Sequence, residues 1–173
     1  MTSLSGRRVV LQRFSESDIT DAYIGWLNDP VTMRLSNQRF LRHDRQSSQR
    51  YLSTFEGSPN LFLSVGDKSN GNAIGTMTAY ISPMHGTADM GILIGDRSAW
   101  SRGFGLDAWT TLMQHLLAEL HVRKVTAGTL ACNAAMLSLA AKSGMRSDGQ
   151  RCKQELVDGV PHDILYFAKF ADA

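Results

Sequence analysis

The sequence contains little cysteine and proline, almost no excess charge and no long apolar run. Its two cysteines, Cys132 and Cys152, form neither a CxxC pair nor the framework of a disulfide-rich domain. The net charge of +2 is too small to indicate a nucleic-acid-binding protein, so no nucleic-acid partner is expected. The lack of a membrane-length apolar stretch and of a signal-peptide core argues against a membrane partner and against secretion. These features favour a cytoplasmic, reduced protein, and we assign no metal site.

The residues that are present provide enough apolar material for one core. With 43% hydrophobic residues in a chain of 173, one domain spanning residues 1–173 is expected. No internal repeat or linker divides the chain. Apolar spacing and turn residues predict, in order, a strand, two helices, three antiparallel strands, a helix, a strand, a helix and two strands. The last two strands are expected to form a hairpin turned at Asp158-Gly159.

The most informative stretch runs from Asp89 to Trp109. It opens with the apolar run Ile92-Leu93-Ile94, which predicts a buried strand, and from Leu106 the apolar spacing becomes helical. The turn between them is rich in glycine. The first N–H groups of a helix have no partner within it, and glycines let an anion approach them closely. We interpret this turn as a cradle for a diphosphate. The backbone amides expected to form it are those of Arg102, Gly103, Phe104, Gly105 and Leu106.

The same letters also fit a dinucleotide-binding fingerprint. Residues 103–108 read G-F-G-L-D-A, which matches G-x-G-x-x-G/A. That site requires an acidic residue at the end of the next strand to bind a ribose. The next predicted strand, Val125 to Leu130, is followed by Ala131-Cys132-Asn133 and carries no carboxylate there. Dinucleotide binding is therefore the second interpretation of the turn.

Two motifs resemble those of the GNAT N-acetyltransferases. The stretch from Trp100 to Gly105 is similar to the acetyl-coenzyme A signature Q/R-x-x-G-x-G/A, with Trp100 in place of Gln or Arg. The stretch from Asn133 to Met145 is similar to the second motif, in which an Asn opens a helix that closes on Lys-x-Gly-Phe. With the strands around them, the two motifs cover residues 60–170. The resemblance implies the α+β GNAT fold, with a mixed, mostly antiparallel sheet of about six to seven strands and helices on both faces.

The resemblance also implies an activity, which is transfer of an acetyl group from acetyl-CoA, as co-substrate, to a primary amine. In this family the strand corresponding to Ile92, Leu93 and Ile94 diverges from its neighbour, which frees backbone groups for the cofactor. Asn133 corresponds to a cofactor-contacting Asn of the family, and its type and position also suit a helix N-cap. Dimers are common in the family, so a homodimer is possible.

The acceptor is expected to be a small-molecule amine, for example an amino sugar nucleotide. The stretch Tyr23 to Pro30 is similar to an element of GNAT enzymes that acetylate amino sugars on nucleotide carriers, and it also occurs near protein N-terminal acetyltransferases. Candidate acceptor-binding residues are Trp26, Asn28 and Arg34. Arginines can bind phosphates, and they recur at positions 34, 39, 42, 45 and 50. The alternatives are a core Trp, a simple turn and a solvated arginine-rich helix face.

The sequence departs from the family where a proton donor is expected. Many members have a Tyr at the position of Ala140, and the ribosomal-protein subgroup has a Ser at the position of Met136. Tyr166 is the other phenol that could serve. As a base, Asp89 at the start of the central strand and His85 in the preceding turn are the candidates, although such residues are often only solvated. Cys132 is expected to be a small buried residue.

Two rival functions remain open from the sequence. One is a protein N-terminal acetyltransferase of the ribosomal-protein-modifying type, which the missing Ser at position 136 disfavours. The other is a non-catalytic GNAT-like module that binds acyl-CoA, which the missing proton donors keep open. A nucleic-acid binder that uses the arginines ranks last, because few aromatic residues are interleaved with them.

Overall fold

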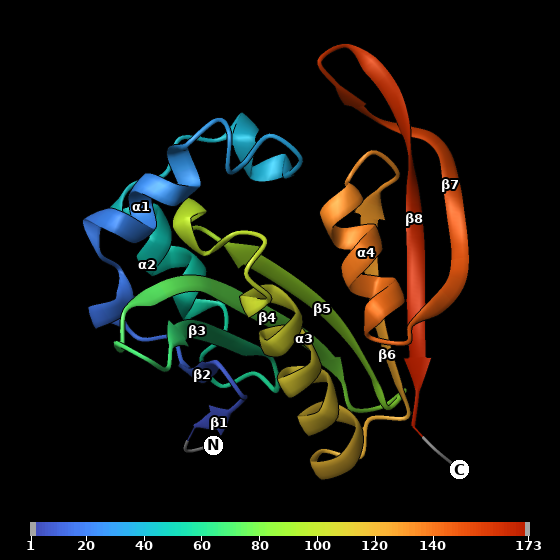
Figure 1. Cartoon of the computed structure of the whole chain (residues 1–173), viewed down its shortest axis with the longest axis horizontal. Helices are drawn as coiled ribbons and strands as arrows, with labels where there is room; N and C mark the ends of the chain where they lie inside the picture. Colours follow the sequence, from blue (N-terminus) through green and yellow to red (C-terminus); the bar gives the residue numbers. More distant parts are fainter. Residues whose placement is uncertain (1–2, 172–173) are drawn as a thin grey trace.

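The computed structural model describes residues 3–171, which build an α+β fold on an eight-stranded sheet (Figure 1). The strand order is β1-β2-β3-β4-β5-β6-β8-β7, and neighbours are antiparallel except for β5 and β6. The strands are β1 (Leu4–Ser5), β2 (Val9–Arg13), β3 (Leu61–Asp67), β4 (Ala73–Ser82), β5 (Thr87–Ile94), β6 (Lys124–Leu130), β7 (Arg146–Val157) and β8 (Val160–Phe170). The mixed, mostly antiparallel sheet is confirmed. The strand count is higher than expected because the short β1 pairs with β2 at one edge.

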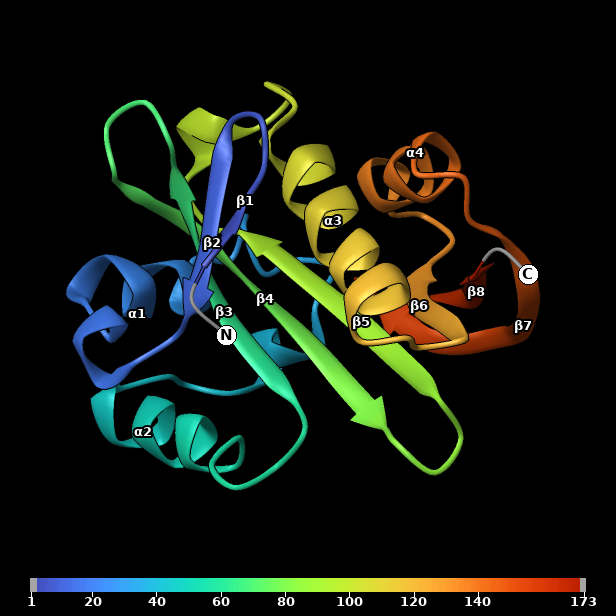
Figure 2. The ribbon, with the colours of Figure 1, turned by 90° about the horizontal axis from the view of Figure 1, so that it is seen from below.

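Helices cover both faces of the sheet, as expected. They are α1 (Asp21–Asn28), α2 (Arg45–Ser53), α3 (Phe104–Gln114) and α4 (Ala134–Lys142). Figure 2 shows α1 and α2 on one side of the sheet and α3 and α4 on the other. Short 3-10 turns lie at Glu16–Asp18 (η1), Asn37–Phe40 (η2) and Arg97–Ala99 (η3). No helix in the described part of the chain is both long and apolar enough to cross a membrane.

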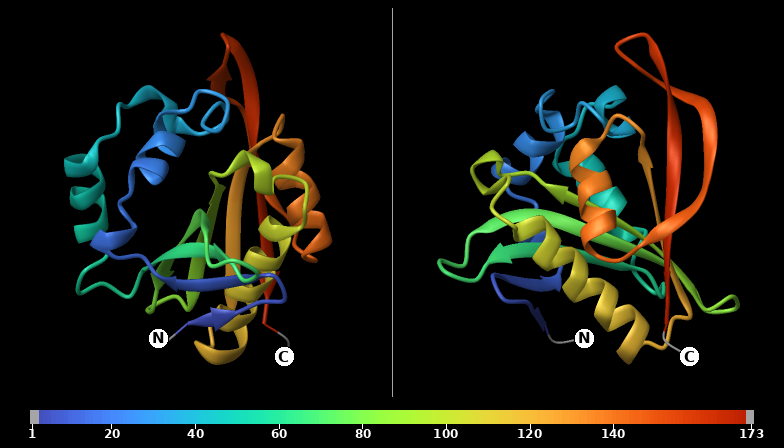
Figure 3. Two further views of the ribbon diagram at one scale, coloured as in Figure 1. Left: turned by 60° about the vertical axis from the view of Figure 1, so that its left-hand side comes forward. Right: turned by 45° about the vertical axis from the view of Figure 1, so that its right-hand side comes forward.

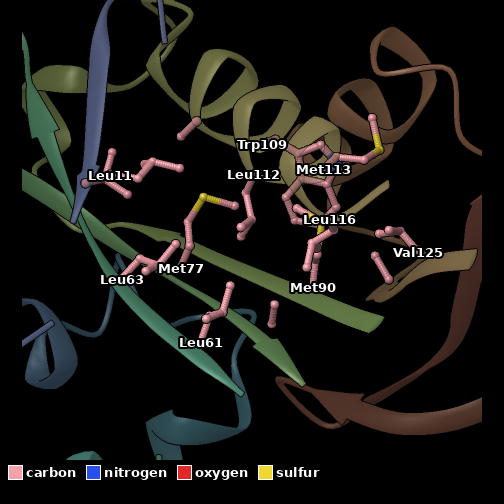
Figure 4. Packing of buried hydrophobic residues seen from close by; sticks show 14 of the residues in the cluster. Leu11, Leu61, Leu63, Met77, Met90, Trp109, Leu112, Met113, Leu116 and Val125 are labelled. Atoms are coloured by element: carbon pink, nitrogen blue, oxygen red, sulfur yellow. The ribbon is translucent and has the colours of Figure 1, made fainter. Parts of the chain in front are cut away.

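The main core lies between the sheet and α3. Trp109, Leu112 and Leu116 have no exposed surface, which is the apolar face predicted for this helix. Figure 4 shows them above Met77 and Met90 of the central strands. A second cluster on the opposite face attaches α1 and α2 to β3. Its buried members are Phe14, Ile19, Tyr23, Phe55 and Phe62. Each such burial contributes about 1.5–3 kcal/mol relative to exposure, so both helical layers are held firmly on the sheet.

The chain before α1 forms a capping box, in which Ser15 is the N-cap of the 3-10 turn η1. Ile19 then leaves the helical conformation (φ −76°, ψ 70°), and Thr20 caps α1. Two local expectations were wrong. The central helix does not remain an α-helix to its end, because His115–Glu119 form a π-turn (η4). Cys132 is exposed rather than buried, since it lies in the turn before α4.

The sheet opens into two halves between β5 and β6. These strands pair in parallel at only three positions, the last being Asp89 with Thr126. On its other edge β5 stays paired with β4 as far as Ile94 opposite Gly75. Beyond Asp89, the β6-facing edge of β5 therefore leaves the ladder, and Figure 3 shows the two strands diverging. Backbone groups of residues 90–94 on that edge are available to a ligand.

Candidate active site

The glycine-rich turn forms the N-terminus of α3. Gly103 is the N-cap and has φ of 85°, a left-handed conformation that residues other than glycine rarely adopt. The first helical hydrogen bond is donated by the Asp107 N–H to the Gly103 carbonyl at 3.1 Å. The N–H groups of Phe104, Gly105 and Leu106 therefore precede the helical ladder and can bind an anion. This arrangement fits the diphosphate of a coenzyme A molecule.

The cradle lies beside the open edge of β5. A Cβ placed on Gly105 would be 3.6 Å from Ile94 Cγ1 and 3.9 Å from Leu139 Cδ1 of α4. The end of β5, the first turn of α3 and the side of α4 thus meet around this residue. The structure therefore brings the predicted cradle residues together with Ile94, at the end of the Ile92–Ile94 run.

Asn133 lies at the other side of this junction as the N-cap of α4. Its Oδ1 accepts a hydrogen bond from the Met136 N–H at 3.2 Å. The capping role is thus present, and a contact with the cofactor stays a prediction. The side-chain amide N–H groups are the part of Asn133 that a ligand could use, because the oxygen already serves the helix.

A feature of the cradle that the sequence interpretation missed comes from the N-terminal hairpin. The carboxylate of Asp107 accepts the backbone N–H groups of Arg7, Arg8 and Val9, at 3.1, 2.7 and 3.1 Å. The guanidinium of Arg8 in turn donates to the carbonyl of Arg102 at 2.6 Å. This hydrogen bond holds the positive charge of Arg8 beside the glycine-rich turn. No local pattern could reveal it, because the partners are about one hundred residues apart in sequence.

A cavity of about 420 Å³ opens on the opposite face of the same strand. It lies under α1, α2 and the loop around η2, and its floor includes Gly91, Ile92 and Leu93 of β5. This volume is within the range of small-molecule sites. Gly91 permits the close packing of the floor, since a Cβ there would be 2.8 Å from Thr78 Oγ1. One strand therefore links the cradle region to a pocket suited to an acceptor.

The three predicted acceptor-binding residues are placed around this pocket rather than in its lining. The ring of Trp26 packs on Gly95, where a Cβ would overlap it, and so attaches α1 to the end of β5. Asn28 binds both backbone groups of His43, accepting its N–H at 2.9 Å and donating to its carbonyl at 2.8 Å. His43 itself lines the pocket. Trp26 and Asn28 thus position the walls of the pocket.

Arg34 belongs to a set of contacts between the η2 loop and the tip of the β7–β8 hairpin. Its guanidinium forms an ion pair with Asp158 at 2.9 Å, and both side chains are largely exposed. Two further bonds lie beside it, from Asn37 to Glu155 at 3.0 Å and from Arg39 to the Leu156 carbonyl at 2.8 Å. We call these three contacts the hairpin latch. The hairpin turn is at Asp158-Gly159, as predicted, with φ of 50° and 79°.

Asp89 lies where the two halves of the sheet separate, as the last residue of β5 that pairs with β6. Its side chain is exposed and accepts a hydrogen bond from Thr126 Oγ1 at 2.7 Å. Although the residue keeps solvent-accessible surface, the surrounding protein displaces part of the water around its carboxylate and so raises the pKa of Asp89 above the ordinary 3.8, while the bond from Thr126 opposes this increase. Along β5 it alternates with Ala88 and Met90, which are buried toward α3, so it faces the side on which the acceptor pocket lies.

His85 lies away from the open edge of β5. It is in the turn before β5, ahead of the first position at which β5 pairs with β6, Thr87 with Lys124. Its carbonyl accepts a bond from Arg123 Nε at 2.7 Å, so it belongs to the far end of the sheet. Among the candidate bases, geometry therefore favours Asp89.

Tyr166 lies on the same face as Asp89, in the other half of the sheet. Its ring covers Gly128, where a Cβ would be 3.0 Å from Cε1. Gly128 is two residues after Thr126 on β6, so Tyr166 lies beyond the last pair between β5 and β6, in the half of the sheet that contains β6 and β8. Ala140, at the family's usual tyrosine position, is buried in α4. Within residues 3–171, no three His, Cys, Asp or Glu side chains are grouped as a metal site.

Comparison with known proteins gives one family and many similar folds. The sequence profile of the GNAT acetyltransferase domain matches residues 8–146. RimL, a ribosomal-protein alpha-N-acetyltransferase in complex with coenzyme A, has a TM-score of 0.85 at 16% identity over 99% of both chains. A GNAT-family acetyltransferase from Bacillus anthracis has a TM-score of 0.82 at 15% identity, over 97% of this chain and 98% of its own. The microcin C7 self-immunity acetyltransferase MccE, in complex with acetyl-CoA and AMP, has a TM-score of 0.80 at 16% identity, over 95% of this chain and 93% of its own. No protein of curated function matches the sequence.

A sheet that opens beside a glycine turn and a helix N-terminus is the architecture of an acyltransferase domain. The family match spans most of the chain, and the chain belongs to the GNAT acetyltransferases. The expected fold is therefore confirmed. Structures at 15–16% identity establish the fold and leave the acceptor open.

Proposed function

We propose that this protein is an acetyl-CoA-dependent N-acetyltransferase that modifies a primary amine of a small molecule. The observation that carries the proposal is the position of β5. One edge of this strand leaves the ladder beside the cradle of α3, while Gly91, Ile92 and Leu93 form the floor of the pocket. A cofactor bound at the open edge and an amine bound in the pocket would meet at these residues, which is the proximity that acyl transfer requires.

The residues of the chain would divide the work of the reaction. The amides of Phe104, Gly105 and Leu106 would bind the diphosphate, and the free backbone groups at Ile92–Ile94 would orient the pantetheine arm and polarise the thioester carbonyl. Acetyl-CoA supplies the activated acetyl group. Asp89 would accept the proton that the amine loses, and its raised pKa is suited to that task. Tyr166 would be the proton donor from the other half of the sheet.

The arginine segment gives less support to a nucleotide-linked acceptor than the sequence suggested. Three of its members are already bonded within the protein. Arg34 pairs with Asp158, Arg39 donates to Leu156, and Arg45 donates to the Ile19 carbonyl at 2.7 Å. An acceptor without phosphate groups therefore fits the observed geometry better.

Thermal unfolding with and without acetyl-CoA tests the proposal, followed by detection of released thiol in the presence of amines. A ligand at one hundred times its dissociation constant stabilises by about 2.7 kcal/mol, which is readily measured. Stabilisation together with amine-dependent thiol release supports an acetyltransferase. Stabilisation without thiol release from any amine supports the sensor module, and no stabilisation contradicts the cradle.

A further inference from the structure

The lining of the acceptor pocket is polar without being charged. Hydroxyl and amide groups come from residues such as Ser36, Gln38 and Thr78, and apolar walls from residues such as Leu27 and Leu41. None of the described residues that line it is Asp, Glu, Lys or Arg. A cavity of about 400 Å³ beside η1 differs in this respect, because its lining includes the charged residues Arg13, Glu16 and Glu56.

The ionisable groups that do line the pocket offer no negative charge. Burial raises the pKa of Tyr23 to about 12 and raises that of Tyr51 as well, so both phenols keep their protons at neutral pH. Tyr51 also shares a hydrogen bond of 2.8 Å with the hydroxyl of Tyr80. His43 Nε2 lies 3.1 Å from the carbonyl oxygen of Gln38. Because a carbonyl oxygen can only accept a hydrogen bond, this nitrogen carries a proton.

Four charged side chains near the pocket are bonded to other partners, namely Asp29, Arg34, Arg39 and Asp44. The carboxylate of Asp44 caps α2 and accepts the Ser47 N–H at 2.7 Å. The carboxylate of Asp29 accepts the backbone N–H of Thr32 at 3.0 Å. The nearby arginines at 34 and 39 belong to the hairpin latch. A charge carried into the pocket on a ligand would lose water without meeting an opposite charge in the lining, which is unfavourable.

We infer that the acceptor is a monoamine whose body, apart from the reacting amine, is uncharged and partly apolar. This inference rests on the proposed function and narrows it. Polyamines would place a second ammonium group in the pocket, and phosphorylated amino sugars would place a phosphate there. Neither finds an opposite charge among the lining residues. Hydroxyl groups on the acceptor can bond to the hydroxyl and amide groups of the walls, and apolar groups can pack on the leucines.

Two matched pairs of amines test the inference. They are butylamine with 1,4-diaminobutane, and glucosamine with glucosamine 6-phosphate. Binding to the coenzyme A-loaded protein is measured by calorimetry, and transfer by thiol release from acetyl-CoA. In each pair we expect the amine without the second charged group to bind more tightly and to be acetylated more efficiently, by about tenfold or more. A neutral tripeptide amide in the same assays distinguishes a peptide N-terminus from a small free amine.

A pocket variant makes the test independent of any one amine. Gln38→Glu adds a carboxylate to the lining with almost no change in shape, and should move preference toward the diamine by about tenfold. Gln46→Glu adds the same charge on α2 outside the lining and should leave the ratio unchanged. Equal or tighter binding of the charged members, or no binding by any neutral monoamine, overturns the inference. Failure of acetyl-CoA to bind would instead contradict the proposed function.

Discussion

Gly103 and Gly105 are one residue apart, yet they contribute differently to the cradle. Gly103 is required for its backbone conformation, because its φ is 85°. Lack of space is not the reason, since a Cβ there would meet nothing within 4 Å. Gly105 has no such conformation, and its missing Cβ leaves room between Ile94 and Leu139. The first glycine therefore shapes the turn, and the second keeps the junction with β5 and α4 open to a ligand.

Replacing Gly103 tests the cradle directly. Gly103→Glu should abolish the stabilisation by acetyl-CoA, because a carboxylate would stand where the diphosphate binds. Gly57→Glu is the matched control, since Gly57 also has positive φ, of 66°, and open space around it, in the loop after α2. Both variants should lose about 1 kcal/mol in the absence of ligand. Equal stabilisation of the two variants by acetyl-CoA would show that the anion site lies elsewhere.

Asp89 should make stability depend on pH in a defined direction. Because burial raises its folded-state pKa above 3.8, its contribution to stability is fully present below that pH and is lost as pH rises through the folded-state value. In Asp89→Asn, the side-chain amide oxygen can still accept the hydrogen bond from Thr126, but the side chain cannot ionise. We therefore expect the variant to gain stability relative to the wild type as pH rises above 3.8, in urea unfolding followed across pH.

The activity of the same variant gives a separate result. If Asp89 accepts the amine proton, Asp89→Asn lowers kcat and removes the acidic limb of the pH–rate profile. Thr126→Val removes the hydroxyl that opposes the raised pKa, so that limb should move to higher pH. An unchanged profile in both variants would rule Asp89 out as the base.

At the level of elements, the attachment of the β1–β2 hairpin to α3 depends on one carboxylate. Asp107→Ala would leave the N–H groups of Arg7, Arg8 and Val9 without their acceptor, which should cost about 2 kcal/mol of the free energy of unfolding. Asp21→Ala is the control, because it also removes an acidic residue from a first helical turn and should cost less than about 1 kcal/mol. Denaturant titration distinguishes them. Similar losses would mean that the hairpin is held by packing alone.

The elements that could be predicted from sequence are those with local causes. The glycine turn, the Asn133 cap and the Asp158-Gly159 hairpin turn each depend on neighbouring residues, and each is present in the structure. The contact of Asn28 with His43 and that of Asp107 with the N-terminal hairpin join segments separated along the chain. Their formation depends on the finished sheet, so spacing and propensity carried no signal for them.

At the scale of the whole molecule, the η2 loop links the acceptor pocket to the C-terminal half of the sheet. Ser36, Gln38 and Leu41 of this segment line the pocket, while Arg34 and Arg39 bind the tip of the β7–β8 hairpin. Figure 3 shows the tip of the hairpin near this loop. The hairpin latch therefore restrains a wall of the pocket from outside.

Breaking the latch should change the acceptor site with little effect on stability. Arg34→Ala removes an exposed ion pair, which is worth at most about 1 kcal/mol. Since the pair restrains the loop, hydrogen exchange should become faster across residues 34–43 and the KM for the amine should rise, while the affinity for acetyl-CoA stays the same. Arg42→Ala is the matched control, because no hydrogen bond or ion pair of the Arg42 side chain occurs within residues 3–171. If hydrogen exchange across residues 34–43 is equally fast in both variants, the hairpin latch does not restrain the loop. If Arg34→Ala instead weakens acetyl-CoA binding, the two halves of the site are coupled through the sheet.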